Sequence, residues 1–141
     1  MPTARGALFV TEHEGKLYVI GGYDRTANTS VVEVYDPATD HWTRVADLPT
    51  ARSGITAVVV EGKIYVFGGE GVVGTFNENE AYDPVRDRWQ GMAPLPTARH
   101  GLGSAVIQGR IYVISGGPTP GGSFSDVNEV FIPPGKNVKT D

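Results

Sequence analysis

The sequence repeats itself every 47 residues. The tetrapeptide Pro-Thr-Ala-Arg begins at Pro2, Pro49 and Pro96. A second pattern, Gly-(Lys/Arg)-(Leu/Ile)-Tyr-Val, recurs at the same step and leads into a glycine pair. The 141 residues hold three such periods. Self-similarity at this period indicates a repeat architecture, in which one repeat cannot bury its core without a neighbour.

Composition narrows the class of protein. The chain is 40% hydrophobic and 20% charged, which is typical of a globular domain. A net charge of -4 gives no reason to expect nucleic acid or an anionic membrane as a partner. No apolar run approaches the ~20 residues that a membrane helix needs, and no secretory signal follows Met1. The lack of cysteine excludes disulfides and thiolate metal sites but assigns no compartment.

Each repeat is expected to form four short antiparallel strands. In the second repeat these cover residues 54–60, residues 63–67, residues 80–82 and the residues around Trp89, because runs rich in valine, isoleucine and tyrosine end at glycine or Asp-Pro. Glu61-Gly62 predicts a tight hairpin between the first two strands. An Asp-Pro turn joins the last two.

Side-chain size grows along each repeat. The first strand is rich in small residues, such as Gly54, Ala57 and Gly101, whereas Tyr35 and Trp42 come late in their repeat. Small residues suit an innermost strand where several sheets converge, and large ones suit the wider outer space. This gradient favours radial propeller blades over a flat solenoid.

The glycine pair, the tyrosine seven residues before a tryptophan and the 47-residue period together resemble kelch repeats. The resemblance implies an all-β fold of β-propeller blades, most often six to a ring. The expected units are blade 1 (residues 1–48), blade 2 (49–95), an incomplete blade 3 without its tryptophan strand (96–134) and a tail (135–141). The residues expected to maintain the blades are Gly21, Gly22, Gly68, Gly69, Gly116, Tyr35, Trp42, Tyr82, Trp89, Arg5, Arg52 and Arg99.

Two repeats depart from the pattern. In the third, Ser115 stands at the first glycine, which predicts that the pair has shifted by one residue to Gly116-Gly117. Phe131 replaces the tyrosine after a loop two residues longer. In the first repeat, Glu12-His13 stand where the second has Val59-Val60, and the sequence does not show how that carboxylate is accommodated.

Three blades are too few to cover their own flanks. Propellers have about four to eight blades, and monomers rarely expose large contiguous apolar patches. We therefore expect two copies to pair into a six-bladed homodimer, with an interface of about 2,000 Å² or more. The alternative is an excised half of a longer propeller. The tail around residues 137–140 is either a short outer strand or a frayed terminus.

Function is expected on one face of the blades. The residues that follow the repeated arginine lie there with the loops 23–32, 70–79 and 117–128, which differ between repeats. The glycine pairs are followed by Tyr23, Glu70 and, with the expected shift, Pro118. The candidate ligand-binding residues are Tyr23, Arg25, Asn28, Ser53, Glu70, Phe76, Asn77 and His100. The alternative is that these loops merely cap the blades.

The three arginines allow two interpretations. Around one mouth they would form an anion funnel. A residue present in every blade is better explained by bonds to neighbouring carbonyls or carboxylates, and Glu33, Glu80 and Glu129 are the expected partners.

No enzyme motif is evident. His13 and His41 fall in two different hairpin turns and His100 falls on the opposite face, so the three histidines do not predict a metal site, and no cofactor is expected. The sequence favours a non-catalytic binding or scaffold module with a protein or sugar ligand. The alternative is a fragment or relic of a carbohydrate-active kelch enzyme. An oxidase-like copper–radical site would lack its cysteine, whereas a mutarotase-like site would use His100 and Glu70 as acid and base.

Overall fold

The computed structural model describes residues 1–135, in which eleven strands form three separate antiparallel sheets and no helix occurs. Their orders are β1-β2-β3-β4, β5-β6-β7-β8 and β9-β10-β11. The strands are β1 (Phe9–His13), β2 (Lys16–Ile20), β3 (Val32–Asp36), β4 (His41–Arg44), β5 (Thr56–Val60), β6 (Lys63–Phe67), β7 (Asn79–Asp83), β8 (Arg88–Gly91), β9 (Gly103–Ile107), β10 (Arg110–Ile114) and β11 (Asn128–Phe131). We call the sheets blades 1, 2 and 3.

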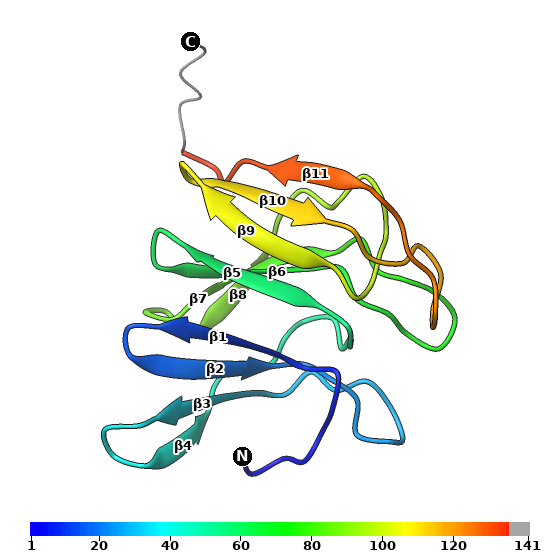
Figure 1. Cartoon of the computed structure of the whole chain (residues 1–141). Helices are drawn as coiled ribbons and strands as arrows, with labels where there is room; N and C mark the ends of the chain where they lie inside the picture. The colour runs from blue at the N-terminus through cyan, green and yellow to red at the C-terminus, as the bar shows by residue number, and fades with distance from the viewer. Residues whose placement is uncertain (136–141) are drawn as a thin grey trace.

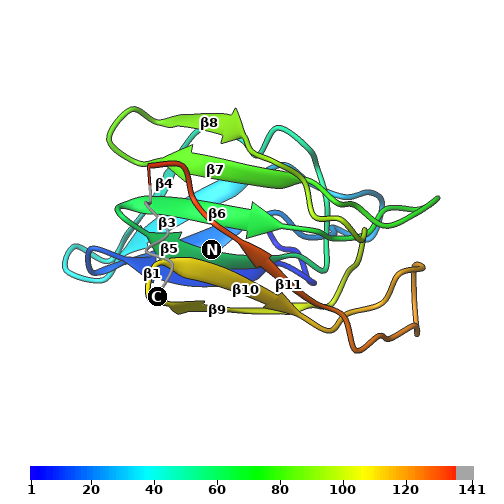
Figure 2. The same ribbon diagram turned by 90° about the horizontal axis from the view of Figure 1, so that it is seen from above.

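The blades stack around their first strands, as predicted. β1, β5 and β9 lie side by side, and later strands lie progressively further out (Figures 1 and 2). β5 and β9 begin two residues later than the expected starts at Gly54 and Gly101. Gly54 and Gly101, both with φ of 62°, are instead used between blades: Gly54 N donates to the carbonyl of Ala7 (2.9 Å), and Gly101 N donates to that of Gly54 (2.7 Å).

Local turn chemistry explains the hairpins. Glu61 and Gly62 have φ of 50° and 74°, the two left-handed residues that a type I′ turn requires. In the outer turn of blade 2, Asp83 accepts hydrogen bonds from the amides of Val85 (3.0 Å) and Arg86 (3.1 Å). The hairpin turns gather at one end of the blades and the longer loops at the other (Figure 1).

The core consists of two layers, each between neighbouring blades. Ile20 and Val32 of blade 1 pack with Ile64 and Val66 of blade 2. On the other side of blade 2, Tyr65 and Phe67 belong to a cluster with residues of blade 3, including Ile111 and Val113. Blade 2 is therefore covered on both faces, whereas blades 1 and 3 each have one neighbour.

The outer tyrosine–tryptophan pair ties blade 2 to blade 1. The rings of Tyr82 and Trp89 lie 5.0 Å apart, and Trp89 Nε1 donates to the carbonyl of Ala46 (2.9 Å). Asp87 accepts from the Tyr82 hydroxyl (2.6 Å) and from Ala46 N (2.8 Å), and these bonds hold the pKa of Asp87 below its usual value. Burial and the Asp87 hydrogen bond raise the pKa of Tyr82.

Blade 3 has three strands within the described residues, and the predicted tail strand at 137–140 lies outside them. Phe131 takes the tyrosine position, because it pairs with Ile111 as Tyr82 pairs with Ile64. Its ring packs towards blade 2, 5.7 Å from that of Tyr65.

The structure also shows how Glu12 is accommodated. Its side chain is exposed, and Oε1 accepts a hydrogen bond from the Gly15 amide (2.7 Å) in the following hairpin turn. The carboxylate therefore stays in contact with solvent and stabilises the turn, at no cost of burying a charge.

Candidate functional site

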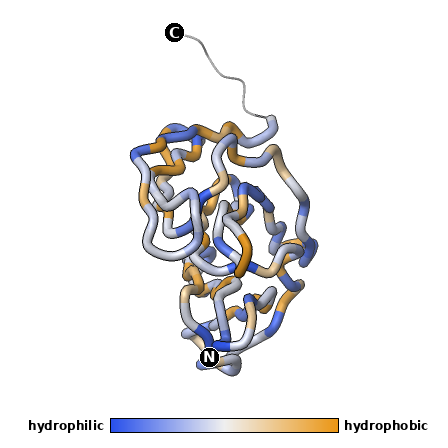
Figure 3. Tube along the Cα trace, turned by 90° about the vertical axis from the view of Figure 1, so that its right-hand side faces the viewer, coloured by the Kyte–Doolittle hydropathy of each residue, from blue (hydrophilic) through white to orange (hydrophobic). Residues whose placement is uncertain are grey.

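The predicted common face exists. In each blade the residue after the arginine pairs through its backbone with the residue that follows the glycine pair. Gly6 bridges to Tyr23, Ser53 to Glu70 and His100 to Gly117. We call the end of the blades that carries these bridges the loop face. Figure 3 views the molecule from that side and shows hydrophilic and hydrophobic stretches mixed along its loops.

The predicted shift of the third glycine pair is wrong. Ser115 has φ of 61°, close to the 63° of Gly68, and Gly116 has φ of 93°, also left-handed like Gly69. Ser115 thus occupies the first glycine position directly. Gly117, rather than Pro118, is the counterpart of Glu70. A serine tolerates this left-handed backbone at some cost in strain.

The second glycine of each pair permits a close backbone approach. A Cβ atom on Gly22 would lie 2.6 Å from the carbonyl oxygen of Gly6, and one on Gly69 would lie 2.7 Å from that of Ser53. Gly116 shows the same constraint, at 2.6 Å from the carbonyl of His100. The structural role expected for these glycines therefore follows from the bridges that build the loop face.

The repeated arginines do not form an anion funnel. The side chains of Arg5, Arg52 and Arg99 are fully buried, and each donates to a carboxylate of its own blade. Those partners are Glu33, Glu80 and Glu129, as predicted.

Each guanidinium also holds its own blade's glycine turn. Arg5 Nε donates to the carbonyl of Gly21 (2.8 Å), and Arg99 Nη1 donates to that of Ser115 (2.5 Å). Burial opposes ionisation of Glu33, but hydrogen bonds from Arg5 and Thr3 outweigh it and keep the pKa of Glu33 below its usual value. The arginines are thus structural clamps beneath the loop face.

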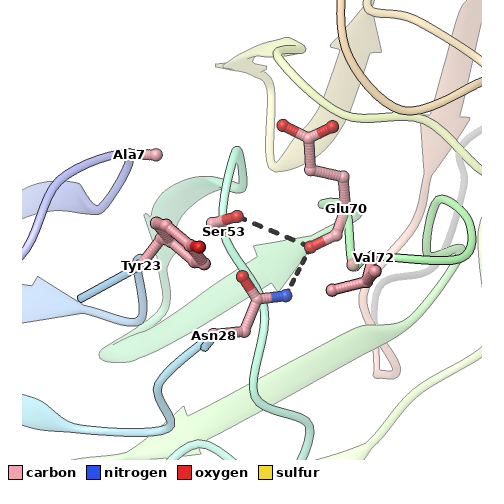
Figure 4. A pocket seen from close by; sticks show the side chains of 7 residues that line it. Ala7, Tyr23, Asn28, Ser53, Glu70 and Val72 are labelled. Atoms are coloured by element: carbon pink, nitrogen blue, oxygen red, sulfur yellow. Dashed lines mark hydrogen bonds between the residues drawn. The ribbon is translucent and has the colours of Figure 1, made fainter. Parts of the chain in front are cut away.

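A pocket of about 270 Å³ lies on the loop face between blades 1 and 2. Its floor is a small polar network in which Asn28 Nδ2 donates to the backbone carbonyl of Glu70 (2.6 Å) and Ser53 Oγ approaches the same oxygen at 3.5 Å (Figure 4). Tyr23 and Val72 lie on opposite sides of it. The lining residues are Ala7, Tyr23, Asn28, Ser53, Glu70, Gly71 and Val72.

The Glu70 carboxylate points away from Asn28 and towards blade 3 (Figure 4). Its Oε1 lies 3.5 Å from His100 Nδ1, and its Oε2 accepts from the amide of Gly121 (2.9 Å). His100 Nε2 lies 3.1 Å from the carbonyl of Thr119. The fold therefore brings Glu70 and His100 into contact. Both ring nitrogens face acceptors, so the pair anchors the loop of blade 3.

Of the remaining candidates, Arg25 faces solvent, whereas Phe76 and Asn77 make backbone hydrogen bonds that hold the fold. Arg25 is exposed in the loop that Asp24 orders, where hydrogen bonds from the side chain of Thr26 and from nearby amides lower the pKa of Asp24 to about 2. Phe76 accepts from Arg99 N (3.1 Å) and Asn77 accepts from Leu95 N (2.8 Å), both through their carbonyls. None of these three lines the Asn28–Ser53 pocket.

Three residues that line the pocket were not predicted from the sequence: Ala7, Gly71 and Val72. Val72 is 94% exposed and Val73 is fully exposed, in a loop of a protein whose other valines lie mostly in strands. Two adjacent valines within a predicted loop were the available signal, since strongly exposed apolar side chains often mark a contact surface.

Within residues 1–135, no three histidine, aspartate or glutamate side chains gather closely enough to hold a metal ion. The same residues contain no helix long and apolar enough to cross a membrane.

Comparison with known proteins places these features in a family. The family model described as the KLHDC2/KLHL20/DRC7 Kelch-repeats domain matches residues 1–132. The influenza virus NS1A-binding protein homolog of Mus musculus is 46% identical over 48 residues, and the influenza virus NS1A-binding protein of Homo sapiens is 44% identical over 48 residues. Each alignment covers 34% of this chain and 8% of the relative.

A solved structure shares the fold. The structure of YjhT superposes with a TM-score of 0.75 at 25% identity, covering 84% of this chain and 36% of that one. The chain thus spans little more than a third of YjhT and a small part of the curated relatives it matches. With its three radial blades, buried arginine clamps and glycine-pair bridges, this chain belongs to the kelch-repeat β-propeller family.

Proposed function

We propose that this kelch-repeat chain is a non-catalytic recognition module that binds a polypeptide segment on its loop face. The pocket between Tyr23 and Val72 carries the proposal. It combines an aromatic ring and an exposed valine with the polar floor of Asn28 and Ser53. Its volume of about 270 Å³ suits one apolar side chain. Asn28 uses its Nδ2 for the Glu70 carbonyl, and its Oδ1 has no hydrogen-bond partner within residues 1–135, so this oxygen is available to accept from a peptide amide.

The chemistry of His100 argues against catalysis. A general base needs a free nitrogen within reach of the proton it takes. Both nitrogens of His100 face acceptors in the protein, the Glu70 carboxylate and the Thr119 carbonyl. The Glu70 contact leaves only Nε2 for a substrate, and the Thr119 carbonyl occupies that nitrogen, so we infer a positioning role for the ring. The second candidate function, a carbohydrate-active mutarotase-like site, rests on this same carboxylate–imidazole contact.

A peptide library displayed on phage and panned against the purified chain tests recognition. We expect enriched sequences with an apolar anchor residue, and synthetic peptides whose affinity falls about fivefold or more with Tyr23→Ala or Val72→Ser, because loss of a buried aromatic or apolar contact costs more than ~1 kcal/mol. Val85→Ser is the matched control, since Val85 is equally exposed (92%) but lies in a hairpin turn. Enrichment that is indifferent to Tyr23 and Val72 would overturn the proposal.

Polarimetry with a panel of reducing sugars tests the alternative. The recognition module predicts no acceleration of mutarotation beyond that of buffer. Acceleration that His100→Asn removes, in a variant that stays folded by circular dichroism, would establish the enzymatic alternative instead.

We also propose that a second copy covers the open flanks of blades 1 and 3. Corresponding positions in blades 2 and 3 show that the outer face of blade 3 lacks a neighbour. Val60, Phe67 and Ala81 of blade 2 are 5%, 0% and 2% exposed, whereas their blade 3 counterparts are 57%, 45% and 49% exposed. Those counterparts are Ile107, Ile114 and Val130.

The open flank of blade 1 shows the same contrast. Val10 and Leu17 are 45% and 39% exposed, against 4% and 0% for Ala57 and Ile64 of blade 2. Both outer flanks thus carry the apolar residues of an inner junction without the neighbouring blade. Two chains joined by twofold symmetry would supply both neighbours and give six blades.

A further inference from the structure

The first glycine of each pair lies directly against the next blade. A Cβ atom on Gly21 would lie 2.7 Å from the carbonyl oxygen of Arg52, and one on Gly68 would lie 2.5 Å from that of Arg99. Distances below about 3.0 Å are essentially never seen for real Cβ atoms. At both junctions, meaning the contacts between successive blades, only glycine lets the backbones meet.

The close approach lets backbone hydrogen bonds cross each junction. Gly22 N donates to the Arg52 carbonyl (3.1 Å), and Gly69 N donates to the Arg99 carbonyl (2.8 Å). A second bond runs the other way at each junction, from Gly54 N to the carbonyl of Ala7 and from Gly101 N to that of Gly54. Each of these junctions therefore contains a pair of backbone bonds of opposite direction.

The two ends of the chain carry the complementary halves of the same pattern. On blade 3, the amide of Gly116 and the carbonyl of Gly101 have no hydrogen-bond partner among residues 1–135. On blade 1, the same holds for the carbonyl of Arg5 and the amide of Ala7. Suppose that blade 1 of a second copy docks on blade 3 as blade 2 docks on blade 1. Gly116 N then meets the Arg5 carbonyl of the second copy, and the Ala7 amide of the second copy meets the Gly101 carbonyl.

Ser115 breaks the glycine rule at this closing junction. It takes the first glycine position with φ of 61°, is exposed, and donates from Oγ to the carbonyl of Ser125 (3.0 Å). Its Cβ occupies the place where, at the other two junctions, a Cβ would press on the neighbouring arginine carbonyl.

Resting on the proposed association, we propose that Ser115 makes the contact between copies the weakest junction of the ring, so that the ring opens there while the junctions within each chain stay closed. The Arg5 carbonyl of a second copy therefore has to lie further from Ser115 than the Arg52 carbonyl lies from Gly21. That displacement lengthens the Gly116–Arg5 hydrogen bond, which weakens steeply with poorer geometry.

Ser115→Gly and Ser115→Ala isolate the Cβ atom. Both variants lose the hydroxyl and its bond to Ser125, but only glycine removes the Cβ. The easing of φ strain by glycine is present in the free chain as well as in the dimer, so it cancels in the dissociation constant. Sedimentation equilibrium over a dilution series should show about tenfold tighter dimerisation for Ser115→Gly than for Ser115→Ala.

The outcomes separate this inference from the association on which it rests. A wild-type dimer with equal dissociation constants for the two variants overturns the role of Ser115 and leaves the association standing. Chains that stay monomeric in wild type and both variants overturn the association, and the inference with it. Tighter dimerisation by the glycine variant alone supports the inference.

Discussion

Arg52→Ala is expected to lower the free energy of unfolding by about 3–5 kcal/mol, because it leaves the buried Glu80 carboxylate without its partner. Arg52 is fully buried and donates to Glu80, to the carbonyls of Gly68 (2.7 Å) and Val66 (3.2 Å), and to that of Thr50 (3.2 Å). The loss is a large part of the stability of a domain of this size. Urea denaturation followed by circular dichroism measures it.

Two further variants keep this prediction testable where Arg52→Ala does not fold. Thr50→Val removes one hydrogen bond to Glu80 (2.8 Å) and should cost about 1 kcal/mol. Arg86→Ala removes the exposed ion pair with Asp83 and should leave the stability nearly unchanged, because solvent screens that pair. Equal effects from Arg86→Ala and Arg52→Ala would contradict the view that the repeated arginines are buried clamps.

Gly68→Ala should be the second most damaging change, with a loss of about 2–5 kcal/mol. The alanine takes an unfavourable left-handed φ of 63°, which costs about 1–2 kcal/mol. Its Cβ would also press on the Arg99 carbonyl at 2.5 Å and on Leu102 at 2.7 Å, and overpacking of this kind costs about 1–3 kcal/mol more. Thermal and urea unfolding give the difference from wild type.

Gly62→Ala separates the two causes. Gly62 has a similar φ of 74°, but a Cβ there meets no atom within 4 Å. It should therefore show the backbone cost alone, about 1–2 kcal/mol. If Gly62→Ala and Gly68→Ala prove equally destabilising, the contact with the next blade contributes nothing, and the account of why these junctions need glycine is wrong.

The features that recur in every repeat could be predicted from the sequence. The period and the turn residues located the strands, and the recurrence of arginine and glutamate at fixed positions predicted their pairing. The common face followed from strand direction, which brought Ser53, Glu70 and His100 to one end of the blades. Each of these follows from local chemistry or from a pattern repeated three times.

The features that depend on distant backbone approach could not be predicted. Ser115 looked like a shifted glycine pair, because the sequence offers Gly116-Gly117 and only strand pairing shows the register. Val72 and Ala7 line the pocket although they are about 65 residues apart in sequence. The hydrogen bonds that Phe76 and Asn77 accept from the amides of Arg99 and Leu95 could not be predicted either, since they involve main-chain carbonyls that any residue provides.

The mass of the purified chain in solution tests most directly whether the open flanks of blades 1 and 3 are covered by a second copy. Light scattering behind size exclusion, repeated at several concentrations, should give twice the chain mass of 15.0 kDa, about 30 kDa, for wild type and for Val85→Asp in an exposed turn. Ile114→Asp, which places a charge on the open flank of blade 3, should shift the mass to that of one chain. A wild-type chain that stays folded at 15 kDa at every concentration would contradict the account.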